Sequence, residues 1–321
     1  MPTELRNPHD RFFKEVFSRP EVAQDFLQNY LPEGVAALLA PVPPQLRPGS
    51  FVDEALQEHL SDLLYEVRLQ GEEAAYVYVL FEHKSYPEPL ITFQLLRYMV
   101  RIWERDLREA GRSDLRPILP LVLYHGRAVW QIPRTFGALF SGPELLRPYW
   151  PEFSYHLTDL TAFRDEEIKG AVVVRVVALV FKYLHDRALG TRLPDILLTL
   201  RELASQETGL EFLETLLRYL SATADQVTEE ELRRAVTTAF ADRGGTQMAT
   251  LAEKWFGQGL EQGRREGLLA GIQLGLELRF GAEGLRLLPE IATIEEVGVL
   301  RAIHAALKTA GHPDDLRRLY R

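Results

Sequence analysis

The sequence predicts a mixed α/β core followed by an all-helical region. Apolar and polar residues alternate over 62–69 and 75–84, which predicts two strands separated by a turn signal at residues 70–73. Helical periodicity flanks this hairpin, and only helical patterns follow residue 165. We therefore expect a sheet flanked by helices in residues 1–162 and a helical region in the rest of the chain.

The remaining core elements follow in chain order. Residues 10–31 predict an amphipathic helix, which we expect to break near Pro20 because proline removes a helical hydrogen bond. A long helix is predicted over 91–110, and a buried strand over 117–125. Residues 136–160 are rich in aromatics and proline, and we expect them to be irregular. The chain of 321 residues is long enough for two domains, and residues 163–321 form the second.

Composition limits the chemistry that is available. The chain has no cysteine, which excludes disulfides, thiol nucleophiles and iron–sulfur clusters. The net charge of −9 counts against a broadly basic nucleic-acid binder, although it allows a local basic surface. Neither a signal peptide nor an apolar run of membrane-spanning length is apparent, so we expect a cytoplasmic protein without a membrane partner.

The predicted hairpin brings acidic residues together. With its centre at Glu72, Asp62 lies directly opposite Glu82, and Lys84 shares their face. Opposite Cβ atoms lie roughly 5 Å apart, so two carboxylates there repel unless a divalent cation lies between them or one is protonated. A lysine alongside can neutralise charge and orient a water molecule. The alternative interpretation is a solvated hairpin face with a weak ion pair.

The following helix carries a basic stripe. On a helical projection, Tyr98, Arg97, Arg101 and Arg105 all lie within about 60° of Gln94. Phosphate groups bind to such a stripe through guanidinium side chains. An ordinary exposed helix face is the alternative interpretation.

The spacing Asp62…Glu82-x-Lys84 resembles the PD-(D/E)xK nuclease superfamily, which has a restriction-endonuclease-like core. In addition, Gln94-x-x-x-Tyr98 matches the QxxxY motif of RecB-like members. Further short motifs occur in the order expected for one family, the Rpn/YhgA-like recombination-promoting nucleases, which are also described as transposase-like. These motifs lie at residues 10–17, 50–54, 61–65, 80–85, 96–100 and 123–126.

The resemblance implies a metal-dependent DNA endonuclease linked to recombination or mobile elements. Asp62, Glu82 and the main-chain carbonyl of His83 would bind Mg²⁺ or Mn²⁺, and Lys84 would position or deprotonate the attacking water. We weigh this hypothesis against two others. One is a DNA-binding or recombination accessory protein with little cleavage, and the other is a protein-interaction module.

Other site residues are expected from the same resemblance. Gln94 and Tyr98 would steady the scissile phosphate or the water. Asp10 would add a carboxylate from the first helix, with an N-cap role as the alternative, and Lys14 lies one turn later on the same face as a candidate DNA contact. For His125 we expect local hydrogen bonding, with catalysis as the alternative.

The C-terminal region contains five glycines spaced by four residues: Gly259, Gly263, Gly267, Gly271 and Gly275. Each costs about 1 kcal/mol relative to alanine in a helix, so close approach of another helix is the expected compensation. We predict self-association as a dimer through residues 255–277, or docking of this helix on the nuclease core. A mobile, weakly helical tail is the alternative.

Overall fold

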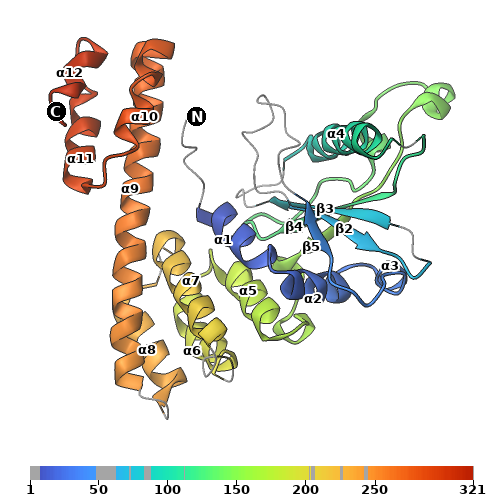
Figure 1. The fold of residues 1–321 in the computed structure, drawn as a ribbon, viewed down its shortest axis with the longest axis horizontal. Helices are drawn as coiled ribbons and strands as arrows, with labels where there is room; N and C mark the ends of the chain where they lie inside the picture. The colour runs from blue at the N-terminus through green and yellow to red at the C-terminus, as the bar shows by residue number, and fades with distance from the viewer. Residues whose placement is uncertain are drawn as a thin grey trace. The chain divides into compact units, whose positions relative to one another are not determined.

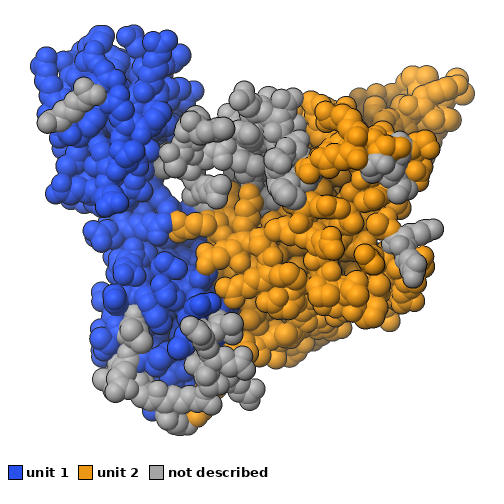
Figure 2. Space-filling view, viewed as in Figure 1, with its two compact units in different colours: residues 1–8, 204–321 blue, residues 9–203 orange. Residues whose placement is uncertain are grey.

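The computed structural model describes residues 8–47, 63–71, 74–82, 88–111, 113–201, 203, 207–224, 227–241 and 245–320. The chain divides into two compact units (Figure 2). We call His9–Leu203 the sheet unit, and Ala204–Arg321, with which residues 1–8 are grouped, the helical unit. The sheet unit extends past residue 162, where the sequence predicts a boundary, and includes two helices beyond it.

A five-stranded mixed sheet forms the centre of the sheet unit (Figure 1). Its strands lie side by side in chain order: β1 (Gln45–Arg47), β2 (Leu63–Arg68), β3 (Ala74–Glu82), β4 (Ile118–Tyr124) and β5 (His156–Asp159). The first three strands are antiparallel neighbours, whereas β4 is parallel to both β3 and β5. The expectation that 136–160 lacks regular structure is therefore wrong for β5, because four residues are too few to show a periodic pattern.

The hairpin of β2 and β3 differs in register from the prediction. Leu63 pairs with Val79 and Arg68 pairs with Ala74, whereas the predicted register pairs Leu63 with Phe81. The predicted register is therefore wrong by two residues over the described pairs, whereas Asp62, which it placed opposite Glu82, lies outside the described residues. A shift of two residues leaves each side chain on its original face, because side chains alternate with a period of two.

The start of the turn contacts a distant segment of the chain. Leu69 forms an antiparallel bridge with Leu39, and the backbone N–H of Gln70 donates to the carbonyl of Leu38 at 2.9 Å. These bonds hold the start of the turn against the chain that follows α3 (Glu33–Ala36). Arg68 and Ala74 are the last described pair of the hairpin before this turn.

Helices cover both faces of the sheet (Figure 1). One face is covered by α4 (Ile91–Ala110), which has the bounds predicted for it and ends at Gly111 with a left-handed φ of 59°. The other face is covered by α1 (Pro8–Phe17), α2 (Pro20–Tyr30) and α5 (Val172–Tyr183), and α6 (Leu189–Thr199) packs beside α5. The predicted break near Pro20 is confirmed, since proline begins α2 where no backbone donor is needed.

The helical unit is built on the long helix α9 (Gly245–Leu285), which has a kink at Gly281, where φ is 58°. Its first half packs against α7 (Glu207–Thr223) and α8 (Glu229–Ala239). Its second half packs against α10 (Leu288–Ile291), α11 (Val297–Ala306) and α12 (Pro313–Arg317). Among the residues described, no helix combines the length and the apolar character that crossing a bilayer requires.

The glycines that recur every four residues in α9 allow close contacts with other helices of this unit. A methyl group on Gly259 would lie 2.6 Å from the carbonyl oxygen of Arg218 in α7, and one on Gly271 would lie 2.9 Å from the ring of His304 in α11. Close approach of another helix is therefore confirmed, but the neighbours belong to the same unit. Gly267 has no such neighbour among the described residues. Self-association through this helix stays a prediction.

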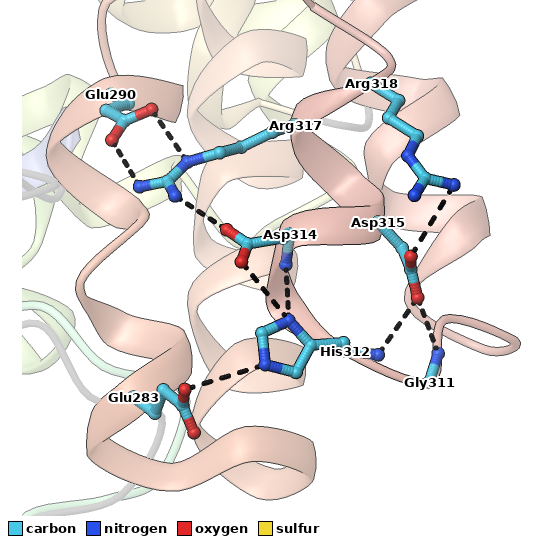
Figure 3. Close-up of polar contacts among 8 residues, drawn as sticks. All are labelled: Glu283, Glu290, Gly311, His312, Asp314, Asp315, Arg317 and Arg318. Carbon is cyan, nitrogen blue, oxygen red and sulfur yellow. Dashed lines mark hydrogen bonds and ion pairs between the residues drawn. The ribbon is translucent and has the colours of Figure 1, made fainter.

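Polar contacts fix the last helix of the unit (Figure 3). Arg317 of α12 forms an ion pair with Glu290 of α10 at 2.8 Å and a second with Asp314 at 2.6 Å. His312 caps α12, because its Nδ1 accepts a hydrogen bond from the backbone N–H of Asp314. These contacts hold the chain end against the rest of the helical unit.

Candidate active site

The candidate site lies at the carboxyl ends of the parallel strands. Glu82 is the last residue of β3 and pairs with Tyr124, the last residue of β4. This edge is where α/β sheets usually place their ligands. Asp62, His83 and Lys84, and the side chain of Glu82, lie outside the described part of the structure. Their convergence on a metal therefore stays a prediction.

Helix α4 leads toward the same edge. The Tyr76 hydroxyl donates to Asp106 Oδ1 at 2.8 Å, and the Tyr78 ring lies 5.2 Å from the Tyr98 ring. Later residues of α4 thus lie beside earlier residues of β3, so the helix and the strand are antiparallel. The first turns of α4 consequently lie toward the carboxyl end of β3. Gln94, one turn before Tyr98, is half-buried there.

The side chain of Tyr98 is buried in the core. It is 3% exposed and packs among Ile91, Leu95 and Ile102, whereas Val100 is 40% exposed. The helical projection groups Tyr98 with the arginines of the basic stripe, and the burial of its side chain shows that this placement is wrong. The physical reason is that the tyrosine ring is mostly apolar and packs against another ring of the sheet.

The arginine stripe on α4 is partly compensated by acids of the same helix. Arg101 pairs with Glu104 at 2.9 Å and Arg105 pairs with Glu109 at 2.6 Å, while Arg97 is exposed. Exposed pairs of this kind contribute little to stability, so a phosphate group can replace the carboxylate at small cost. The stripe is thus not a strongly positive surface, and its contact with DNA stays a prediction.

The first helix also begins at this edge. The ring of His9 lies 5.7 Å from the ring of His125, which directly follows β4. Asp10 is next to His9 and lies inside the first turn of α1, so it is not the N-cap. Lys14 follows in the last turn and is half-buried. The first turns of α1 and α4 and the carboxyl end of β3 are therefore at one edge of the sheet.

A buried polar network lies toward the opposite end of α4, and the sequence analysis missed it. Arg116 donates to Glu66 at 3.1 Å and to the Tyr76 hydroxyl at 3.0 Å, and it pairs with Asp106 at 3.5 Å. Arg47 of β1 also pairs with Glu66. Burial and the hydrogen bond to Asp106 raise the pKa of Tyr76 to about 12. The predicted register conceals this network, because it pairs Glu66 with Tyr78, whereas the structure pairs Glu66 with Tyr76.

The donor types of the predicted site suit a hard cation. Carboxylate and main-chain carbonyl oxygens are the ligands that Mg²⁺ and Mn²⁺ prefer. Within the described residues, no three or more acidic, histidine or cysteine side chains are arranged to hold a metal ion. Asp62, His83, Lys84 and the side chain of Glu82 lie outside that described part, so the fit rests on donor chemistry and on Asp10.

Comparisons with known proteins give a consistent result. The model of the family described as "Putative transposase, YhgA-like" matches residues 7–211. Recombination-promoting nuclease RpnC of Escherichia coli (strain K12) is 32% identical over 190 residues, which are 59% of this chain and 62% of RpnC. Recombination-promoting nuclease RpnA of the same strain is 32% identical over 183 residues, 57% of this chain and 62% of RpnA. The chain thus spans less than two thirds of either protein.

A longer match is to a relative with a different description. Inactive recombination-promoting nuclease-like protein RpnE of Escherichia coli (strain K12) is 30% identical over 267 residues, 82% of this chain and 86% of RpnE. No solved structure is significantly similar to this chain. The sequence relatives therefore include both nucleases and a protein described as inactive.

Proposed function

Because this chain belongs to the YhgA-like family of transposase-related proteins, we propose that it is a metal-dependent DNA endonuclease that acts in recombination. The observation that carries the proposal is the antiparallel packing of α4 on β3. This packing places the helical turn of α4 that contains Gln94 toward the end of β3 at Glu82. The start of α1, with Asp10, lies at the same edge. The names of RpnC and RpnA as recombination-promoting nucleases support the reaction type.

The roles proposed for the residues follow from their chemistry. Asp62, Glu82 and the His83 carbonyl hold the cation, and Asp10 is a further oxygen donor. A bound Mg²⁺ or Mn²⁺ supplies a Lewis acid for the phosphate. Lys84 would position the attacking water as an ammonium or, as the neutral amine, would take up its proton, because lysine is a compact group with a tunable pKa.

Contacts with DNA involve the helices at the same edge. Gln94 would contact the scissile phosphate. Tyr98 would act indirectly, because its ring is buried and its packing fixes the position of the helix. Arg97, Arg101, Arg105 and Lys14 are assigned to backbone phosphates. The net charge of −9 and the compensated arginines predict weak binding that falls steeply with salt.

A second candidate function is DNA binding in recombination without cleavage. The similarity to RpnE, which is described as inactive and is matched over 86% of its length, favours it. This chain has an Asp…Glu-x-Lys pattern with its lysine present. That lysine favours cleavage as the first hypothesis.

Purified full-length protein tests the proposal with supercoiled plasmid and Mg²⁺ or Mn²⁺, and EDTA as the metal-free control. We expect nicking or linearisation that is lost in Asp62→Ala and in Lys84→Ala. Asp195→Ala and Lys254→Ala are matched controls, because both side chains are exposed on helices outside the candidate site. Each should cleave like the wild type.

Three outcomes separate the hypotheses. Cleavage that disappears only in the site variants supports the endonuclease. DNA binding at low salt without cleavage, unchanged by metal, supports the accessory protein and overturns the nuclease. If the protein neither binds nor cuts DNA, a role in protein interaction replaces both.

A further inference from the structure

Three imidazole rings from distant parts of the sequence meet beside the end of β4. The His125 ring centre lies 5.7 Å from that of His9 and 5.8 Å from that of His185, and His9 and His185 are 6.4 Å apart. His9 comes from the start of α1, and His185 follows α5. The cluster therefore joins a strand end to two helices of the sheet unit.

His125 is the centre of this cluster. It is 1% exposed, and its ring stacks on Phe181 of α5 with centres 4.9 Å apart and planes 25° apart. Phe181 also packs edge-to-face with Phe12 of α1, with ring centres 5.7 Å apart. Two adjoining rings, His125 and Phe181, thus contact α1 at His9 and at Phe12. The two contact points are three residues apart, which is about one helical turn.

Two contacts one turn apart define both the position and the rotation of the first turn of α1. Asp10 lies between the two contact residues in the chain, and one of its carboxylate oxygens is buried. His125 is covalently joined to Tyr124, the parallel partner of Glu82. The ring cluster consequently connects the backbone at the end of β4 to the part of α1 that carries the Asp10 carboxylate.

We propose that His125 is a positioning residue that, through its ring contacts with His9 and Phe181, sets the Asp10 carboxylate against the carboxyl ends of β3 and β4. This inference rests on the proposed function, in which Asp10 serves the metal site. The imidazoles themselves are not the metal site, since no group of described side chains is arranged to hold a metal. The role of His125 is therefore indirect, like that of other groups that orient metal ligands.

The test compares Mn²⁺ binding with DNA cleavage in the full-length protein. Free Mn²⁺ is measured by its electron paramagnetic resonance signal, which needs no activity. We expect His125→Ala to raise the Mn²⁺ concentration for half-saturation roughly tenfold to hundredfold, as ligand-orienting residues usually do. The Mn²⁺ concentration for half-maximal cleavage should rise by the same factor, whereas cleavage at saturating Mn²⁺ should change much less.

Matched variants separate positioning from loss of folding. His125→Phe keeps a ring on Phe181 and should bind Mn²⁺ like the wild type. Phe181→Leu keeps His125 but removes its stacking partner and should weaken Mn²⁺ binding, which provides a test if His125→Ala does not fold. His156→Ala is the control, because His156 is half-buried in the same unit and contacts the Tyr30 carbonyl instead.

The outcomes distinguish this inference from the proposed function. If wild-type protein neither binds Mn²⁺ nor cleaves DNA, both fail. Suppose that the wild type binds Mn²⁺ and cleaves DNA. If Asp10→Ala then binds Mn²⁺ normally, the positioning role is overturned and the nuclease stands. The same conclusion follows if the folded variants His125→Ala and Phe181→Leu both bind Mn²⁺ normally. Weakened binding in His156→Ala to the same degree would also overturn it, because the effect would then not be local.

Discussion

The hydroxyl of Tyr76 on β3 donates a hydrogen bond of 2.8 Å to the carboxylate of Asp106 on α4. Both residues are buried, at 6% and 8% exposure. This bond fixes the far end of α4 on the strand, and the packing of Tyr98 on Tyr78 continues the contact toward the candidate site. The orientation of the helix therefore depends on a polar pair outside the site.

Tyr76→Phe should lower the free energy of unfolding by about 1–3 kcal/mol, because it leaves buried Asp106 without one of its donors. Arg116 remains beside that carboxylate and limits the loss. Urea unfolding followed by circular dichroism measures the change. Tyr149→Phe is the control, since Tyr149 is 83% exposed. Equal stability of both variants would contradict a structural role for the bond.

Stability should fall at alkaline pH. Burial raises the pKa of Tyr30, Tyr76 and Tyr155 from 10.0 to about 12 in each case. The unfolded chain releases these protons near pH 10, whereas the folded chain keeps them, so folding is favoured below pH 10 and this contribution is lost between pH 10 and about 12. Urea unfolding across this range tests the trend, and Tyr30→Phe should make it shallower. A pH-independent free energy of unfolding would refute the assignment.

Asp25→Ala should destabilise the sheet unit by about 1–2 kcal/mol, as loss of a helix cap does. The carboxylate of Asp25 on α2 accepts a hydrogen bond of 2.6 Å from the backbone N–H of Ala171, which precedes α5. Asp25→Asn keeps an acceptor and should lose less. Asp195→Ala, at an exposed position in α6, provides a control for removal of a carboxylate. Thermal and urea unfolding compare the three variants.

Two glycines of α9 should respond in opposite directions to the same substitution. Gly259→Ala places a methyl group 2.6 Å from the Arg218 carbonyl oxygen and should destabilise the helical unit by about 1–3 kcal/mol. Gly267→Ala meets no described neighbour and should stabilise the helix by up to about 1 kcal/mol. Thermal unfolding of the full chain compares them. A loss of stability in Gly267→Ala would indicate an additional neighbour at that position, such as a second copy of the chain.

Local patterns in the sequence were sufficient for several elements of the fold. Helix α4 has its predicted bounds because its apolar periodicity is strong and Gly111 ends it. The break before Pro20 follows from the missing N–H of proline. In the hairpin, the alternation of side chains is correct although the register is not, because a shift of two residues leaves the local period of two unchanged.

The candidate site was only partly accessible to such patterns. Spacing within a helix shows that Gln94 and Tyr98 are one turn apart, but it does not show that Tyr98 is buried. The meeting of His9, His125 and His185 depends on tertiary packing of three segments, and no local period contains it. The predicted contact of Asp62 with Glu82 stays a prediction, because these side chains lie outside the described residues.

The arrangement of α9 has a consequence for how the helical unit unfolds. The bundle with α7 and α8 and the bundle with α10, α11 and α12 are both built on the same helix, at its two halves. Neither bundle has a complete apolar core without its half of α9. Because helix formation is cooperative along one helix, order in either half of α9 favours order in the other, and each bundle thereby helps to stabilise its neighbour.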